Sequence, residues 1–556
     1  MQIFLINFVI ILNFYTLGTL FLKNLEFHSF LNKFSLSCVF GAIFVSFIAL
    51  LLNFFFPLDK LIGNIFIIIS FLFFLVIIYS EKNKLNLLKF TFLSSIIGAI
   101  LIIYSTTYRP DSGLYHLPYI QLINEHKILI GISNIHLRFG HISILQYLSA
   151  IYNNSFFPIE VIVLPPAIIA GSIFLYFFSF LEKKYNFLEL KIFVSLIAIY
   201  SLYSFNRYSG FGNDATSHLF LFLISIFFLQ KQFQIKNIDY FGAVALISIF
   251  IFMQKTFMIF LPIICLCLYL FFLIKKNIYK NFKILFSIIF IILWIIKNVL
   301  VSGCLVFPIS ILCFDSLNYV NIDLIKEFEI RSESWSKDWP NRTDQNIKMS
   351  VFNENFNWFK IWYNNHFNFV VKKLTPFILL LLLILVYGYT FSKNSIREIN
   401  TIFIKKNYLI LCLSFLFCII WFLKFPIYRY GQSFLALTFI SAFVLCFIYF
   451  SHIEKVKNLL IVTTILISLV VVSKNFLRIY QKNEIRNQWP NIYTLSELKK
   501  DNYKKKLIPI MNNNVFIYYF NNNGECMYNL SPCSNFLIDG INKKIKNNYE
   551  IFYIEN

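Results

Sequence analysis

Long apolar stretches recur along the whole chain and limit what it can fold into more than any other feature. Roughly fourteen of them approach the length of about 20 residues that a helix needs to cross a bilayer. They lie near residues 3–22, 34–56, 61–79, 90–107, 158–181, 192–204, 215–229, 240–253, 256–274, 284–301, 374–391, 408–423, 433–450 and 459–473. A soluble core cannot absorb so much apolar surface, whereas a membrane can. The sequence therefore predicts an all-α integral membrane protein with about 12–14 transmembrane helices.

Composition agrees with this prediction, because 58% of the residues are hydrophobic and 14% are charged. The first stretch lacks a basic start and a small-residue cleavage site, so we expect it to be a retained span and not a signal peptide. The net charge of +22 comes from scattered lysines and not from a basic stripe interleaved with aromatic residues. We therefore expect membrane lipids, and no nucleic acid, as partners.

Lysine and arginine gather in alternate short connections, which predicts the orientation of the chain. By the positive-inside rule these connections are cytoplasmic, and both termini then face outward. The predicted outer segments are 108–157, 205–214, 302–373 and 424–432, followed by 474–556. The alternation is unbroken if 240–253 and 256–274 are separate spans; a single bent helix is the alternative. The transmembrane domain is expected to cover 1–473, and a small outer subdomain with short β-strands 474–556.

The ten cysteines provide a second line of evidence for the orientation. Two close pairs, Cys304 with Cys313 and Cys526 with Cys533, fall in predicted outer segments and are disulfide candidates, the second across a hairpin. Four free thiols or a shared zinc site are the alternatives, although neither pair has C-x-x-C spacing. The remaining six are predicted to be small buried hydrophobic residues inside spans: Cys38, Cys265, Cys267, Cys412, Cys418 and Cys446.

Segment 108–157 is too long for a simple connector and concentrates groups that can do chemistry. Asp111 lies beside arginine and histidine at the end of a span, which suits a general base or a ligand of a substrate's metal. The alternative is a helix cap, because 110–113 is also a good turn sequence. The candidate catalytic residues here are Asp111 and His116, and the candidate substrate-binding residues are Arg109, Tyr115, His136 and Arg138.

Three further charged residues border apolar stretches. Asp214 begins the seventh stretch, where an ionisable group usually has a partner or caps the helix, and it is a third catalytic candidate. Lys255 is a candidate partner for an acidic group or a substrate phosphate, or it extends to the lipid headgroups. Arg429 lies between two spans, where it can hold a lipid-linked diphosphate.

Two patterns in the outer segments indicate elements at the membrane interface. An apolar stripe at helical spacing predicts an interfacial helix within 117–128. Tryptophan at an interface is normally an anchor, and stacking on a sugar or isoprenoid is the alternative. The tryptophans concerned are Trp335, Trp339, Trp358 and Trp362.

Several motifs occur in a fixed order: D-x-G-L-Y-H at 111–116, N-x-H-x-R-F-G at 134–140, a lysine-to-proline segment at 297–308, W-x-x-x-W-P at 335–340, Y-R-Y-G at 428–431 and the cysteine pair at 526 and 533. In these the chain resembles a family of uncharacterised bacterial polytopic inner-membrane proteins. Its architecture is also remotely similar to the GT-C class of glycosyltransferases. The acidic loop, however, follows the fourth apolar stretch instead of the first, and it has no adjacent acidic pair.

The resemblance to GT-C enzymes implies a GT-C-like fold and roles for four residues. Asp111 would be the base or metal-site residue and Asp214 a second acidic group. Lys255 and Arg429 would contact the phosphate of a lipid-linked donor. The cofactor is unknown, and a divalent metal is left open.

We therefore expect a membrane glycosyltransferase of GT-C type at the outer face of the bacterial inner membrane. It would move a sugar from a polyprenyl-phosphate-linked donor to a glycan, lipid or protein. A surface-polysaccharide polymerase or ligase is the alternative within the same class. A transporter or lipid flippase is the alternative from another class, and the chain lacks the internal repeats typical of transporters. Nucleotide hydrolysis has no support, because no Walker A or G-x-G-x-x-G sequence occurs.

Overall fold

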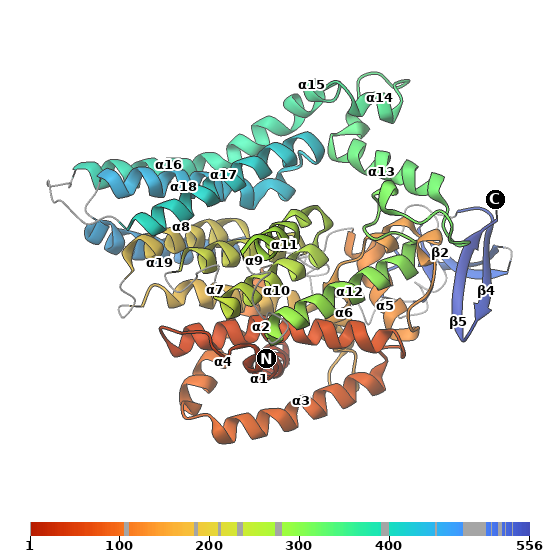
Figure 1. Ribbon diagram of the computed structural model, residues 1–556, viewed down its shortest axis with the longest axis horizontal. Coiled ribbons are helices and arrows are strands. Elements are labelled where there is room, and N and C mark those ends of the chain that lie inside the picture. The colour runs from red at the N-terminus through yellow and green to blue at the C-terminus, as the bar shows by residue number, and fades with distance from the viewer. Residues whose placement is uncertain are drawn as a thin grey trace.

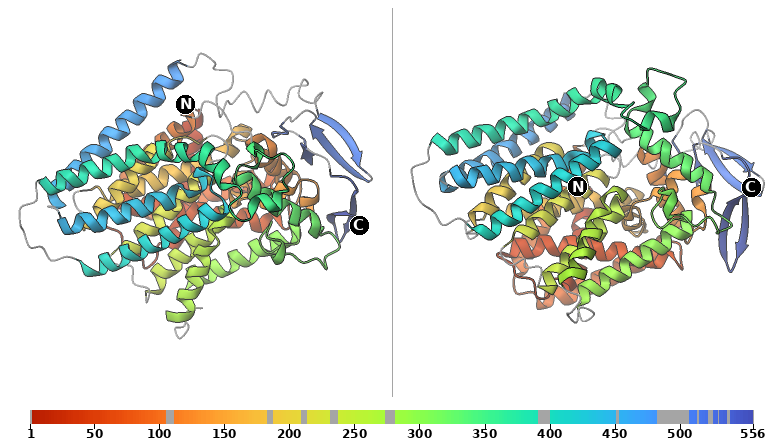
Figure 2. Two further views of the ribbon diagram at one scale, coloured as in Figure 1. Left: turned by 90° about the horizontal axis from the view of Figure 1, so that it is seen from above. Right: turned by 45° about the horizontal axis from the view of Figure 1, so that its top comes forward.

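The computed structural model describes residues 2–104, 111–182, 187–208, 213–230, 237–272, 281–390, 400–450, 453–481, 507–512, 514–520, 525–528, 530–535 and 538–555. Within these residues the protein is mostly helical, with a few short strands near the C-terminus. The long helices run broadly side by side, and the strands lie beyond one end of them (Figure 1). The two further views show the same separation (Figure 2).

Each predicted apolar stretch forms a helix. These helices are α1 (Gln2–Gly18), α2 (Phe30–Asn53), α3 (Lys60–Ser80), α4 (Lys84–Ile103), α7 (Pro165–Ser179), α8 (Leu188–Ser204), α9 (Asn213–Leu229), α10 (Ile238–Gln254), α11 (Phe260–Phe272), α12 (Phe282–Ser302), α16 (Asn368–Thr390), α17 (Thr401–Lys424), α18 (Tyr428–Phe450) and α19 (Ile453–Gln481). Among the described residues, nine helical stretches have the length and apolarity needed to cross a membrane, while α7, α8, α9, α10 and α11 are shorter. This is consistent with the predicted multi-pass membrane protein.

The described part of 240–274 forms two helices and not one bent helix. The helices α10 and α11 are separate, with the short 3-10 helix η6 (Thr256–Met258) between them, and they pack against each other. Lys255 ends α10, and its N–H bonds to the Ile251 carbonyl before the chain turns. The turn places Lys255 at a helix end instead of in the middle of one bent helix.

Burial divides the helices into an inner and a peripheral set. In the most apolar part of α2, 72% of the residues are buried inside the protein, against 28% for α3 and 22% for α19. The exposed residues of α3 are large and apolar, among them Ile68, Leu72 and Val76. An apolar face of this size is stable against lipid and not against water.

The connections between helices gather at two opposite ends of the bundle. At one, which we call the basic end, Lys283 contacts Asp239 at 2.9 Å, and Lys33 pairs with Glu81 at 3.2 Å. The other, which we call the loop end, holds the long segments 111–157 and 303–367 together with the strands (Figure 1). The described parts of the lysine-rich connections lie at the basic end, as the alternation along the sequence predicts.

The loop end is built from short elements. These are η2 (Ser112–His116), α5 (Leu117–Glu125), η3 (Ile132–Asn134), η4 (Leu137–His141), α6 (Ile144–Ala150), η5 (Ile159–Val163), η8 (Ser310–Leu312), α13 (Ile322–Ser336), η9 (Trp339–Asn341), α14 (Met349–Asn353), α15 (Phe359–Trp362) and η10 (Tyr363–Phe367). A last short turn, η1 (Thr19–Phe21), follows α1 at the basic end. None of the loop-end elements is long enough to cross a bilayer.

The predicted interfacial helix forms as α5, but its position differs from the prediction. Every residue of α5 from Leu117 to Asn124 is buried. The helix packs on α6, and the hydroxyl of Tyr528, from the C-terminal segment, donates to Asn124 Oδ1 at 3.1 Å. The apolar stripe therefore packs inside protein and not against lipid, because a distant segment covers the helix.

Three of the four tryptophans predicted to be anchors are also buried. Trp339, Trp358 and Trp362 pack with Phe352 and Ile361 in a small cluster of their own, beside the main core. Trp362 Nε1 donates to the Pro426 carbonyl at 2.7 Å. Anchoring is wrong for these three, which instead connect segment 339–362 to the end of α17. Trp335 is exposed.

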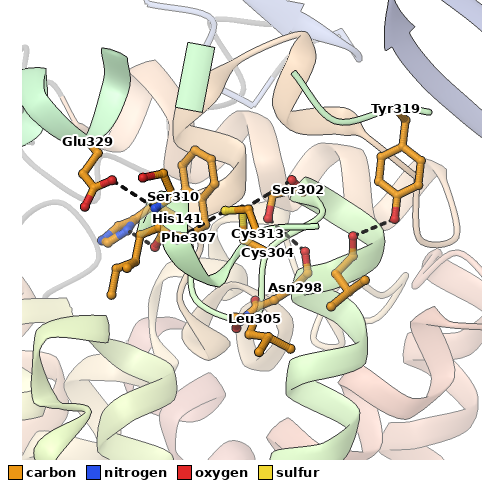
Figure 3. The surroundings of a disulfide bond; sticks show 12 residues. His141, Asn298, Ser302, Cys304, Leu305, Phe307, Ser310, Cys313, Tyr319 and Glu329 are labelled. Carbon is orange, nitrogen blue, oxygen red and sulfur yellow. Dashed lines mark hydrogen bonds between the residues drawn. A yellow bond between two sulfur atoms is a disulfide. The ribbon is translucent and has the colours of Figure 1, made fainter. Parts of the chain in front are cut away.

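Both predicted disulfides are present, Cys304–Cys313 and Cys526–Cys533. The first closes the link between α12 and α13, where Asn298 donates to the Leu305 carbonyl and Glu329 accepts from the Ser310 N–H (Figure 3). The other cysteines all lie in apolar helices, as predicted. Cys267, Cys412 and Cys446 are nevertheless exposed there, on helix faces turned away from the protein core.

The C-terminal strands form two small sheets. β1 (Leu507–Asn512) pairs antiparallel with β2 (Val515–Phe520), and β3 (Cys533–Ser534) pairs parallel with β2. The Cys526–Cys533 disulfide therefore does not cross a hairpin as predicted, since Cys533 runs parallel to its neighbour. The true hairpin is β4 (Ile541–Lys546) with β5 (Tyr549–Ile554).

The C-terminal segment packs on the loop end instead of standing apart. Ile130 donates to the Glu550 carbonyl at 3.0 Å and accepts from the Phe552 N–H at 2.8 Å. The boundary expected at residue 473 falls inside α19, which ends at Gln481. Through β5 the chain's last residues are joined to segment 111–157.

Candidate functional site

Five of the predicted site residues come together at the loop end, in what we call the charge cluster: Asp111, Arg138, Asp214, Lys255 and Arg429. Arg138 Nη1 lies 3.2 Å from Asp111 Oδ1, and Arg429 Nη1 lies 3.6 Å from Asp111 Oδ2. Arg429 also reaches Asp214, with Nε at 3.9 Å from Oδ2. Lys255 Nζ contacts the other oxygen of Asp214. Arg429 thus bridges the two carboxylates.

Four helix ends and one short 3-10 helix place these side chains. Asp214 and Arg429 lie in the first turns of α9 and α18, and Lys255 follows the last turn of α10. Asp111 begins the helical segment 111–125, and Arg138 lies in η4. A carboxylate is stabilised by the positive end of a helix dipole, whereas the guanidinium of Arg429 is not. Arg429 therefore depends on the two carboxylates for its stability in this position.

The carboxylate of Asp111 does not act as the helix cap that was the alternative interpretation. Asp111 precedes η2, but its side chain makes no capping hydrogen bond. Both of its oxygens instead face guanidinium groups, those of Arg138 and Arg429. The Asp111 side chain therefore belongs to the charge cluster and does not cap the helix.

The cluster has an accessible side and an enclosed side. The side chains of Arg138, Arg429 and Asp111 are 43%, 39% and 29% exposed, whereas Lys255 and Asp214 are 17% and 18% exposed. A molecule arriving from outside would meet the arginines and Asp111 first. The Lys255–Asp214 pair supports them from within.

The electrostatics of the cluster keep Asp111 ionised. Burial opposes ionisation of this carboxyl, but the positive charges of Arg429 and Arg138 outweigh that effect and hold the pKa of Asp111 below its ordinary value. At neutral pH the group is a carboxylate. It can therefore accept a hydrogen bond or a proton from a substrate hydroxyl.

His116 and Tyr115, the other candidates in η2, border the cluster. Burial lowers the pKa of His116 to about 3, so its imidazole is neutral at neutral pH. Its Nδ1 contacts Gln146 Nε2, and its ring lies 4.3 Å from the ring of Tyr115. The Arg138 guanidinium lies over that tyrosine ring, 4.8 Å from its centre. Tyr115 thus helps to orient the guanidinium that holds Asp111, and His116 packs against Tyr115.

The last two predicted binding residues are Arg109 and His136. Arg109 lies outside the described residues. His136 accepts a hydrogen bond from the Arg138 N–H at 3.1 Å, and its Nε2 lies 3.0 Å from Asn535 Oδ1. Its ring is buried and holds the C-terminal segment, so the histidine supports the site from behind.

Sequence reasoning missed Tyr430. Its hydroxyl accepts a hydrogen bond from Arg429 Nη2 at 3.0 Å, and the Arg429 and Lys255 cations lie 4.9 and 5.4 Å from its ring centre. An aromatic ring attracts cations electrostatically, so Tyr430 holds both side chains near Asp214. The Y-R-Y-G sequence at 428–431 carried this signal, since it places a tyrosine on each side of the arginine.

His218 fixes the start of α18, which carries Arg429. Its Nε2–H donates to the Arg429 carbonyl at 2.7 Å, and its Nδ1 lies 2.7 Å from Ser433 Oγ. His218 lies one turn after Asp214 on α9. One helix therefore supplies both a carboxylate of the cluster and the group that positions its central arginine.

The C-terminal segment covers the turn that follows Asp111. The Met527 N–H donates to the Gly113 carbonyl at 2.8 Å. A Cβ atom added to Gly113 would overlap the Glu525 carboxylate and the Met527 sulfur, so these two side chains would have to move to admit any larger residue. No local sequence signal could have shown this contact, since Gly113 and Met527 are far apart along the chain.

No group of three or more histidine, cysteine, aspartate or glutamate side chains that could hold a metal ion occurs among the described residues. Both carboxylates of the cluster instead face cationic side chains. A carboxylate surrounded in this way is a poor ligand for a second cation. The arrangement suits an anionic ligand better than a metal.

Comparisons with known proteins place the chain in a family. No curated protein and no solved structure matches it. Residues 1–436 match the family described as Domain of unknown function (DUF8201). The matched range contains all five residues of the charge cluster and ends within α18, before the C-terminal strands. The chain therefore belongs to the DUF8201 family.

Proposed function

We propose that the protein is a membrane glycosyltransferase of GT-C type. It transfers a sugar from a polyprenyl-phosphate-linked donor to a glycan, lipid or protein at the outer face of the bacterial inner membrane. The observation that carries this proposal is the charge cluster, in which three cations and two carboxylates meet at one end of an apolar helix bundle.

The cations suit the phosphate of a lipid-linked donor. Such a donor is confined to the bilayer and its phosphate to the interface, so its binding site must lie at the end of the helices. Arg429 is at 3.6 and 3.9 Å from its two carboxylate partners. These are longer than the usual distance of about 2.7–2.9 Å for a charge-assisted hydrogen bond. A phosphate oxygen can therefore accept hydrogen bonds from those N–H groups of Arg429 that the carboxylates bind only weakly.

Asp111 suits the base for the acceptor. In a single displacement the acceptor oxygen forms a bond to the anomeric carbon, and the bond from that carbon to the phosphate oxygen breaks. The phosphate leaves with the electron pair and is stabilised by Arg429 and Lys255, while the acceptor's proton passes to Asp111. This route inverts the configuration of the anomeric carbon and needs no covalent intermediate on the protein.

The outer location rests on two observations. Lysine-rich connections lie at the basic end, opposite the cluster, and such connections favour the cytoplasmic side. Both disulfides lie at the loop end, and disulfides persist in oxidising compartments. The two observations are independent and favour the same orientation.

The test is to delete the gene in the producing bacterium and to compare the masses of its glycans and glycolipids after complementation. The wild-type chain should restore one or more sugar residues. Asp111→Asn keeps the shape but cannot take a proton, so it should restore less than about one hundredth as much. Accumulation of each variant in the membrane is measured in parallel.

A matched control is Asp323→Asn on α13, whose side chain is 89% exposed and outside the cluster. It should behave like the wild type. Full restoration by Asp111→Asn would remove Asp111 from the mechanism. An unchanged glycan and glycolipid profile in the deletion strain would contradict the proposed transferase activity. Transport would then be the next hypothesis.

A further inference from the structure

A second polar site lies at the other end of the helical segment that begins with Asp111. It is a pocket of about 340 Å³ between the start of α3, the end of α5, the segment after α6 and the C-terminal segment. Gln121 and Glu125 of α5 and Asn153 contribute to its walls, and Tyr528 closes one side. No residue of the charge cluster lines it.

The side-chain amides in the pocket walls are held in place by hydrogen bonds, but some of their oxygens accept none among the described residues. Asn124 Nδ2 donates to the Ala150 carbonyl at 2.9 Å, and its oxygen accepts from Tyr528. Gln121 and Asn153 are 8% and 6% exposed, and among the described residues their side-chain oxygens have no hydrogen-bond partner. A buried acceptor without a partner is costly, so a ligand with hydrogen-bond donors would be favoured here.

The charge of the pocket selects against ions. Among the described residues that line it, Asp59 and Glu125 outnumber the one cation, Lys60, which disfavours a phosphate or another anion. The absence of a metal-binding group of side chains among the described residues disfavours a metal ion. Leu61, Ile159 and the ring of Tyr528 add apolar surface. An uncharged ligand with hydroxyl groups and an apolar carbon face, such as a sugar ring, matches this combination.

Exposed aromatic residues lie a few positions along the chain from residues that line the pocket. Phe55 and Phe56 precede its residues at the start of α3, and Phe156 precedes Ile159; all three are more than half exposed. Exposed aromatic side chains are typical of the membrane–water interface. A ligand could therefore reach the pocket either from water or as the headgroup of a lipid.

We propose that this pocket binds an uncharged sugar residue of a carbohydrate chain, whose next hydroxyl is presented to Asp111. Residues 111–125 form one continuous helical segment, so Asp111 and Gln121 are about 15 Å apart along its axis. That length suits a short oligosaccharide. Sugar binding stands on the pocket alone, whereas its use as an acceptor site rests on the proposed transferase function.

The test is retention of the full chain, held in lipid nanodiscs, on an array of uncharged and acidic oligosaccharides. Each sugar is printed both free and attached to a lipid, so that the two sources are distinguished. The wild type should be retained on uncharged sugars. Ile159→Arg should weaken retention by about tenfold or more, because its side chain fills the pocket and pairs with Glu125.

Leu61→Arg is a second obstructing variant, at a position that is 63% exposed and therefore safe for folding. Phe156→Arg is the matched control, since Phe156 is exposed nearby but does not line the pocket. Retention of the wild type on acidic sugars alone, or on none, would overturn the proposal. Equal retention of both obstructing variants and the wild type would do the same.

Failure of this proposal can be told from failure of the transferase. Asp111→Asn should be retained like the wild type although it transfers nothing. If Asp111→Asn is retained on uncharged sugars and also transfers sugar normally, sugar binding by the pocket is supported and Asp111 is not the base. If Asp111→Asn loses transfer while the obstructing variants are retained like the wild type, Asp111 is supported as the base and sugar binding by the pocket is contradicted.

Discussion

Single residues of the site could be nominated from the sequence, but their partners could not. Asp111, Asp214, Lys255 and Arg429 stood out because an ionisable group at the boundary of an apolar span usually has a partner. Whether each was a cap, a lipid-facing charge or a site residue depended on neighbours in other elements of the fold. His136 had the same local signal as His116 but serves the C-terminal segment. Residue type thus predicted which side chains can act as acids, bases or anion-binding groups. Only the fold showed which of them lie in the site.

The buried histidine His136 gives a prediction about pH. Burial lowers its pKa from 6.5 to about 3, so the folded chain holds it neutral. As the pH falls below 6.5 the unfolded chain takes up a proton that the folded chain refuses. Folding therefore loses about 2 kcal/mol at pH 5 from this residue. His136→Gln should reduce the fall in melting temperature between pH 7 and pH 5, measured in detergent.

His126 provides the comparison for that measurement, because it is partly exposed. His126→Gln should leave the fall in melting temperature as it is in the wild type. An equal fall in His136→Gln and the wild type would contradict the neutral, buried state of His136.

Elements of secondary structure were predicted well where they are apolar and poorly where they are covered by distant segments. The long helices follow from runs of apolar residues, which need no knowledge of the rest of the fold. The interfacial position of α5 was wrong because Tyr528 and its neighbours cover the helix. The parallel pairing of β3 with β2 likewise has no local signal. In both cases the C-terminal segment supplies the missing contact.

That contact predicts the effect of Gly113→Ala. The added methyl group would overlap Glu525 and Met527, which pack on this turn. Overpacking of this kind costs about 1–3 kcal/mol. The C-terminal segment should become more sensitive to protease, and transfer should fall because the turn carries Asp111.

Gly171→Ala on α7 is the matched control, since its added methyl group would lie 3.4 Å from its nearest neighbour, an ordinary contact. Protease sensitivity and transfer should match the wild type in that variant. Unchanged protease sensitivity in Gly113→Ala would show that the C-terminal segment does not depend on this packing.

At the scale of the whole molecule, one arrangement links sequence, fold and proposed function. The alternation of lysine-rich and lysine-poor connections predicted two ends, and the described connections separate in this way. The cluster, both disulfides and the sugar pocket share the loop end. What the sequence could not predict is that Arg429 joins the two acidic residues, because this depends on how α9 and α18 pack.

The orientation predicts which single cysteines can be labelled from outside. Asp344→Cys lies at the loop end and Asn83→Cys at the basic end, and both positions are exposed. A maleimide that cannot cross membranes should label the first in intact spheroplasts and the second only after permeabilisation. Labelling in the reverse order would place the cluster in the cytoplasm.

The most direct measurement is a density map of the protein in nanodiscs with polyprenyl phosphate. We predict phosphate density within hydrogen-bond distance of Arg429 and Lys255, with Asp111 beside it and open to the acceptor side. The lipid chain should follow the apolar helices away from the loop end. A phosphate bound elsewhere, with Arg429 still bridging Asp111 and Asp214, would contradict it.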